Sequence, residues 1–135
     1  MLNKKKVSVL LVLLMFNSLT VAQVNHFQKL KSTPSELIGS QITLHGYLTP
    51  GGGPVLIYNE LSHFCESSLE NSISVFLKKE VNPVELLTNY GNKKVIIEVT
   101  VETRKAGRNY DKVVPVIYLD SLKNILIDSK TNCQG

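Results

Sequence analysis

The alternation in residues 41–48, Gln-Ile-Thr-Leu-His-Gly-Tyr-Leu, is the feature that most constrains the fold. Apolar residues or glycine stand at every second position, with polar or aromatic residues between them. This pattern is typical of a β-strand with one face in a core. The alternation recurs in residues 72–77, 94–102 and 113–119, and residues 55–58 form a short apolar run. We therefore expect a mainly β domain.

In chain order the expected strands are residues 41–48, 55–58, 72–77, 94–102 and 113–119, and one helix is expected between the third and the fourth. Asn82 is the predicted N-cap, Pro83 occupies the first turn and Gly91 ends the helix. The order strand, strand, strand, helix, strand, strand is that of the OB-fold, a five-stranded Greek-key barrel. Residues 122–127 predict a further short strand or a turn, and Pro115 predicts an edge or a bulge in the last main strand. Other small β-barrels and an α+β sandwich are the alternatives.

The first 22 residues have the order of a secretory signal peptide. Three lysines at positions 4–6 precede an apolar run over residues 7–16, and small residues follow up to Ala22. We expect cleavage after Ala22 and export to the periplasm or the medium, with membrane contact only through this leader. A retained membrane anchor is the alternative.

Removal of the leader changes the charge of the chain. The 135 residues carry 15 Lys and Arg against 11 Asp and Glu, and without the three leader lysines 12 remain against 11. The high sequence pI is therefore poor support for nucleic-acid binding. The 113 remaining residues suit one domain. We expect a partly ordered lead-in over residues 23–32, the barrel over 33–127 and a C-terminal tail over 128–135.

Cys65 and Cys133 are the two cysteines of the chain. An oxidising compartment would allow a disulfide between them, which would tie the C-terminal tail to the middle of the domain. The alternative is one buried thiol and one in a frayed tail, because Cys133 is two residues from the C-terminus.

The run over residues 36–48, followed by residues 53–58 and 71–77, resembles small exported bacterial OB-fold-like proteins of unassigned function. The resemblance covers residues 33–127. The chain also resembles, more weakly, the periplasmic bacterial OB-fold family associated with stress and ligand binding. It departs from that family at residues 59–71, where an Asp-x-x-Gly turn should join the second and third strands. These resemblances imply an OB-like fold and export, and fold alone does not settle function.

The sequence predicts no metal site and no cofactor. His63, Cys65 and Glu66 lie close enough in the chain to suggest zinc. A zinc site needs four ligands, or three and a water, and no second pair of ligands has a recognisable spacing. A Cys–His nucleophile built from the same residues would lack a group to orient the histidine, and a disulfide would consume its thiol.

An enzyme is also not expected, because no catalytic motif is present. A metal-dependent hydrolase of the staphylococcal-nuclease type would use acidic metal ligands near two arginines. Arg104 and Arg108 are present, whereas Glu98 and Glu102 fit the outer face of an alternating strand. Hydrolysis is therefore the least favoured alternative.

Binding is the function class that the sequence favours. OB barrels bind ligands on the face of the second and third strands, between two loops that correspond here to residues 49–54 and 103–112. The candidate ligand-binding residues are the outward aromatic residues near these loops with one histidine and two arginines: His45, Tyr47, Tyr58, Phe76, Arg104, Arg108, Tyr110 and Tyr118. Aromatic platforms stack sugars or bases, although exposed aromatic residues are also ordinary surface.

Residues 93–112 hold half of the cations that remain after removal of the leader. These are Lys93, Lys94, Arg104, Lys105, Arg108 and Lys112. They could receive nucleic acid, an acidic polysaccharide or an acidic protein, and a solvated hairpin tip is the plainer interpretation. We expect an exported, non-enzymatic binding or protein-interaction module with a protein or glycan partner. A polyanion or nucleic-acid binder that uses the loop from Arg104 to Lys112 is the alternative.

Overall fold

The computed structural model describes residues 25–51 and 53–133, and the predicted signal peptide over residues 1–22 lies outside them. The described chain is mainly β. Its strands are β1 (Gln41–Leu48), β2 (Leu56–Tyr58), β3 (Ser72–Leu77), β4 (Lys93–Ala106), β5 (Lys112–Leu119) and β6 (Ile125–Lys130). Its helices are α2 (Phe27–Ser32), α3 (Leu61–Cys65) and α4 (Pro83–Tyr90), with short 3-10 turns η1 (Pro34–Leu37), η2 (Leu69–Asn71) and η3 (Leu122–Asn124).

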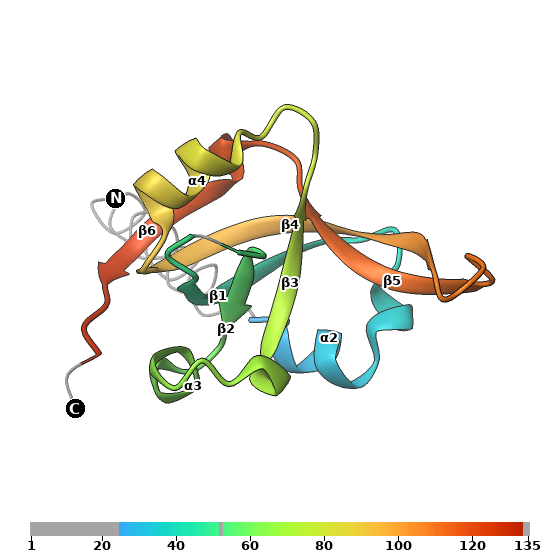
Figure 1. Cartoon of the computed structure of the whole chain (residues 1–135), viewed down its shortest axis with the longest axis horizontal. Coiled ribbons are helices and arrows are strands. Elements are labelled where there is room, and N and C mark those ends of the chain that lie inside the picture. Colours follow the sequence, from blue (N-terminus) through green and yellow to red (C-terminus); the bar gives the residue numbers. More distant parts are fainter. Residues whose placement is uncertain (1–24, 52, 134–135) are drawn as a thin grey trace, which may run out of the picture.

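Five of the strands close into a ring (Figure 1). β1 pairs antiparallel with β2 and with β4, β2 pairs antiparallel with β3, and β5 pairs antiparallel with β4. The ring closes because β3 also pairs with β5, in parallel, over Val75–Leu77 and Ile117–Leu119. β6 continues the path of β5 along the first part of β4. The helix expected between the third and fourth strands is α4.

The core fills the inside of the ring, as the alternation predicts. Ile42, Leu44, Gly46 and Leu48 of β1 are buried, whereas Thr43, His45 and Tyr47, which alternate with them, are only partly covered. β4 repeats the pattern, and Ile97 at its centre is fully buried. β1 and β4 therefore turn their apolar residues inward, and closure of the ring leaves fewer open strand edges than a flat sheet would expose.

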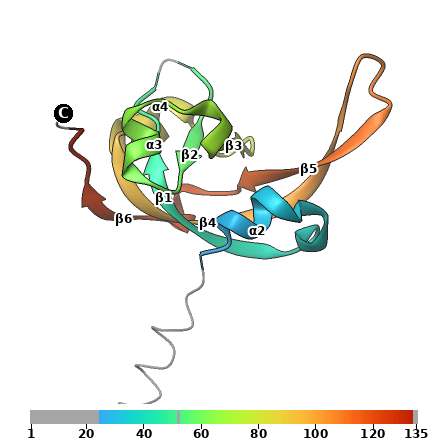
Figure 2. The same cartoon turned by 90° about the horizontal axis from the view of Figure 1, so that it is seen from below.

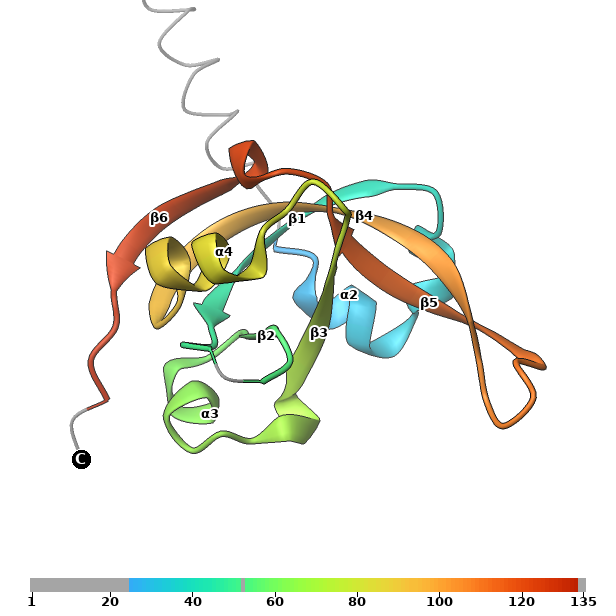
Figure 3. The same cartoon turned by 45° about the horizontal axis from the view of Figure 1, so that its top comes forward.

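Two helices cover the ring on opposite sides (Figures 1 and 3). α4 inserts Leu86, which is fully buried, and α2 contributes Phe27 and Leu30 to the same core. The lead-in expected over residues 23–32 thus includes a packed helix. The sequence did not predict this helix because a segment of six residues with two buried apolar positions shows only a weak helical periodicity.

The predicted N-cap of α4 is confirmed, and it gives a first stability prediction. The Asn82 side chain accepts hydrogen bonds from the backbone N–H groups of Val84 (2.9 Å) and Glu85 (3.3 Å). We expect Asn82→Ala to lower the free energy of unfolding in urea by about 1 kcal/mol, because two N–H groups lose their acceptor. Asn89→Ala is the control, since the Asn89 side chain makes no hydrogen bond to a described residue. An equal loss in both variants would contradict the capping role.

Residues 59–71 form α3 and η2, joined by a short turn, and the disulfide fixes α3 to the end of the chain. Cys65 at the end of α3 is bonded to Cys133, which lies just beyond β6. The disulfide hypothesis is therefore confirmed, and the alternative of two free thiols is wrong. Among the described residues, none belongs to a helix with both the length and the apolar character needed to cross a membrane.

Candidate functional site

The eight predicted binding residues fall into two groups on the outside of the ring. Phe76, Arg104 and Tyr118 lie on adjacent strands β3, β4 and β5, and Arg108 and Tyr110 lie in the turn that joins β4 to β5. The remaining three residues, His45, Tyr47 and Tyr58, lie on β1 and β2. The structure thus brings the residues of the first group together and places the second group at a different part of the ring.

The first group forms a cluster in which cations cover aromatic rings. Phe76 and Tyr118 are neighbours across the parallel β3–β5 pair, and their ring centroids are 5.7 Å apart. The Arg104 guanidinium carbon lies 4.6 Å from the centre of the Phe76 ring, and the Lys78 ammonium lies 4.2 Å from the centre of the Tyr118 ring. Both distances are those of cation–π contacts. We call these four residues the aromatic–cation cluster.

Of the two cations of the cluster, only Lys78 pairs with a carboxylate of the described residues. The Lys78 ammonium lies 2.7 Å from a Glu102 carboxylate oxygen, and Thr100 donates a hydrogen bond of 3.3 Å to the same carboxylate. The hydrogen bond to Glu102 raises the pKa of Lys78 against the opposing effect of desolvation. Among the described residues, Arg104 has no carboxylate within ion-pair distance, so its charge is available to a ligand.

A groove opens beside the cluster because β3 and β5 pair over only three residues each. Toward the start of both strands they diverge. One hollow of about 360 Å³ lies between Phe76 and the hairpin that joins β4 to β5. A second hollow of about 300 Å³ extends from Phe76 toward α2, with Leu30 and Ile73 in its wall. Phe76 and Val116 line both hollows, so we treat them as one groove, the β3–β5 groove.

The rim of the groove is basic. Residues 103–112, which we call the basic hairpin, project beyond the ring (Figures 1 and 2). They carry Arg104, Lys105, Arg108 and Lys112 against a single carboxylate, Asp111. Within residues 25–51 and 53–133, none of these four cations forms an ion pair. An acidic group placed over the groove would therefore find several uncompensated positive charges.

The second group of predicted residues is covered by α3. Tyr58 was expected to face outward, but it is only 2% exposed. The Phe64 ring of α3 lies with its centroid 5.8 Å from those of both Tyr58 and Tyr47. The prediction for Tyr58 as an exposed ligand residue is therefore wrong. Residues 59–71, which interrupt the expected family pattern, supply Phe64, which packs on buried Tyr58 and on partly buried Tyr47.

His45 is bonded through its backbone to Asn25, in the segment before α2. Its backbone N–H donates to Asn25 Oδ1 over 3.3 Å, and Asn25 Nδ2 donates back to the His45 carbonyl over 3.3 Å. The His45 Nε2 atom is buried and has no hydrogen-bond partner among the described atoms. His45 is thus held at the edge of β1 and is not part of the β3–β5 groove.

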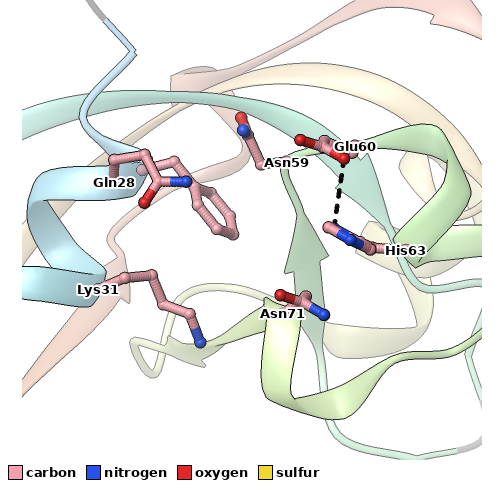
Figure 4. A pocket seen from close by; sticks show the side chains of 7 residues that line it. Gln28, Lys31, Asn59, Glu60, His63 and Asn71 are labelled. Carbon is pink, nitrogen blue, oxygen red and sulfur yellow. Dashed lines mark ion pairs between the residues drawn. The ribbon is translucent and has the colours of Figure 1, made fainter.

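A small polar hollow of about 90 Å³ lies between α2 and residues 59–71 (Figure 4). Lys31 reaches across from α2 and donates to the carbonyls of Glu70 and Ser72, each over 2.8 Å. His63 Nδ1 lies 3.7 Å from a Glu60 carboxylate oxygen. These contacts join α2 to the chain before β3. The hollow is small, its lining includes both Lys31 and Glu60, and the sequence did not predict it.

The sequence hypothesis of zinc at His63, Cys65 and Glu66 has no structural support, because the disulfide occupies the Cys65 thiol. In the described part of the chain, no three His, Cys, Asp or Glu side chains are grouped so that they could hold a metal ion. Two of the residues proposed for nuclease-type hydrolysis, Glu98 and Arg108, lie far apart. Glu98 lies opposite Thr43 of β1, whereas Arg108 lies in the turn beyond Ala106. Positions 98 and 106 are eight residues apart along β4, which corresponds to a strand length of about 25 Å.

Comparisons with known proteins add little. No family model matches the chain, and no curated protein matches it. Among solved structures, the chain is similar to a provisionally assigned aspartyl-tRNA synthetase from Leishmania major Friedlin, with 15% sequence identity and a TM-score of 0.45. The match covers 79% of this chain and 21% of the other, so the chain spans about a fifth of that protein.

Proposed function

We propose that this chain is an exported, non-enzymatic binding module of the OB-fold type, which recognises a protein partner through the β3–β5 groove and the basic hairpin. The OB assignment is supported by the order of strands around the ring and by α4 between β3 and β4. Export is supported by the predicted leader and by the Cys65–Cys133 disulfide, because disulfides persist in oxidising compartments.

The observation that supports a protein partner is that cations cover the two aromatic rings of the cluster. A base or a sugar stacks on an open aromatic face. Here Arg104 lies over Phe76 and Lys78 lies over Tyr118, so a stacking ligand would have to displace cations from both rings. The groove beside them offers aliphatic walls, which include Val114 and Val116, with uncompensated cations on the rim. Apolar surface with a charged rim suits a protein segment better than a glycan or a nucleic acid.

Site-directed photo-cross-linking tests this proposal. A photoreactive phenylalanine analogue at Val114 should capture a protein from an extract of the compartment to which the chain is exported. The same analogue at Leu126, which is 65% exposed on β6, is the position control. Arg104→Glu with Arg108→Glu should reduce capture about tenfold or more, because the rim would repel an acidic partner. Lys123→Glu with Lys130→Glu makes the same charge change away from the groove and should leave capture intact.

Two results would count against the proposal. Equal capture at Val114 and Leu126 would show that the groove is not the binding surface. No capture at either position would argue against a protein partner in that compartment.

A polyanion ligand is the second candidate, and the uncompensated charge of the basic hairpin favours it. Binding of single-stranded DNA or heparin should then be strong at low salt and should weaken steeply as salt rises. The same Arg104→Glu, Arg108→Glu variant should abolish it. Absence of binding at low salt would eliminate this candidate. A nuclease-type activity would instead require hydrolysis that depends on calcium or magnesium and is lost on changing Glu98 and Arg108, and we expect none.

A further inference from the structure

The first part of β5 has a free edge, which follows from how its backbone groups alternate. The Leu119 carbonyl accepts a hydrogen bond over 3.0 Å from the N–H of Lys78, the residue directly after β3. The Tyr118 carbonyl lies on the other side, 3.5 Å from Thr100 Oγ1 of β4. Because backbone groups alternate sides along a strand, those of residues 113, 115 and 117 point toward β3. β3 pairs with β5 only from Ile117 onward, so in the described part of the chain positions 113 and 115 face no strand.

Pro115 fits this assignment. Proline has no N–H to donate, so it is tolerated in a strand where that side faces no partner. The β4–β5 ladder keeps its register through the Thr103–Pro115 pair. The sequence expectation of an edge at Pro115 is therefore confirmed. The free edge offers the N–H and C=O of Val113 and the C=O of Pro115, and it borders the β3–β5 groove.

We propose that the partner contributes an extended segment of alternating apolar and acidic residues, which adds as a strand to the free edge of β5. This inference rests on the proposed function and names the chemistry of the partner. An added strand gains main-chain hydrogen bonds from the edge and specificity from alternate side chains. Apolar side chains would lie in the groove beside Phe76 and Val116, and acidic ones would face the basic hairpin.

Exposed apolar surface along the edge agrees with this mode of binding. Val113 is 64% exposed and Tyr110 is 74% exposed, although both lie in or next to the strand pair. An added strand would cover apolar area there, worth about 25 cal/mol for each Å² removed from water. Nucleic acid has no backbone N–H or C=O pattern that matches a strand edge, so the edge favours a peptide over a polyanion.

The test uses the full exported chain with a synthetic peptide of four Glu-Val repeats as the probe. In backbone NMR spectra we expect shifts at the β3–β5 groove, and in hydrogen exchange we expect the Val113 amide to become protected on binding. Val113→Pro should weaken binding at least tenfold, because it removes the donor on the free edge while leaving the β4 ladder unchanged. Val113→Ala keeps the N–H and should bind within about twofold of the parent chain.

The outcomes separate this inference from the proposed function. Shifts at Phe76 and Arg104 without protection of the Val113 amide would overturn strand addition and leave the groove as the binding surface. A peptide of four Lys-Val repeats that binds as well would overturn the acidic character of the partner. No shift with either peptide would overturn the inference, whereas cross-linking at Val114 would still report on a protein partner. The exchange measurement on the parent chain decides the matter even if Val113→Pro fails to fold.

Discussion

Replacement of both cysteines, Cys65→Ser with Cys133→Ser, should lower the free energy of unfolding by about 4 kcal/mol. The two residues are 68 positions apart in the sequence, and closure of a loop of that length in the unfolded chain has a cost of this order. Both side chains lie at exposed positions, so the serines leave no cavity. Domains of this size are stable by only about 5–15 kcal/mol, so the loss is a large fraction of the total. Urea unfolding of the two proteins measures it.

Reductant provides the matched control for this prediction. The parent chain treated with reductant should unfold at the midpoint of the double-serine variant, and reductant should not move the variant. We also expect faster hydrogen exchange in α3, because the disulfide holds this five-residue helix to the end of the chain. A variant within about 1 kcal/mol of the parent would mean that packing of Phe64 on Tyr47 and Tyr58 suffices to hold α3 in place.

The inward faces of the strands could be predicted from the sequence because burial repeats with period two. In β4, Val95, Ile97, Val99 and Val101 stand at every second position, and all are almost fully buried. The boundaries of α4 were also predictable, since Asn82 and Pro83 give a local capping signal that needs no tertiary contact. Capping of this kind depends only on consecutive residues, so it can be predicted without knowledge of the fold.

The candidate site was only partly predictable because it depends on registers between distant strands. Phe76 and Tyr118 meet through a parallel pairing of β3 and β5, and no local signal specifies which residues lie side by side. The prediction that Tyr58 is exposed was wrong for the same reason. Phe64 belongs to a segment of mixed polarity, and its contact with β2 exists only once residues 59–71 have folded back. The sequence likewise could not decide whether Cys65 and Cys133 are bonded, because the bond depends on where Cys133 lies relative to α3.

Gly46→Ala should be the most damaging small substitution in the ring. Gly46 lies in β1 beside the point where β2 pairs, and a Cβ at this position would collide with the Tyr58 carbonyl oxygen and come within 2.8 Å of Ile57 Cγ1. One of these atoms belongs to the backbone, so β2 itself would have to move away from β1. Overpacking of this kind costs typically about 1–3 kcal/mol, and a backbone clash at a ring closure belongs at the upper end. Urea unfolding should show a loss of about 3 kcal/mol.

Gly53→Ala is the matched control, because a Cβ at Gly53 meets no atom within 4 Å. It makes the same chemical change in the turn between the same two strands, and it should leave stability equal or slightly raised, since alanine restricts the unfolded chain. A loss in Gly53→Ala as large as that in Gly46→Ala would assign the effect to the turn. Little loss in Gly46→Ala would mean that β1 and β2 can separate locally. In that case the close approach of the two strands at Gly46 is not required for ring closure, and the remaining pairings, with the core inside them, suffice to keep the sheet closed.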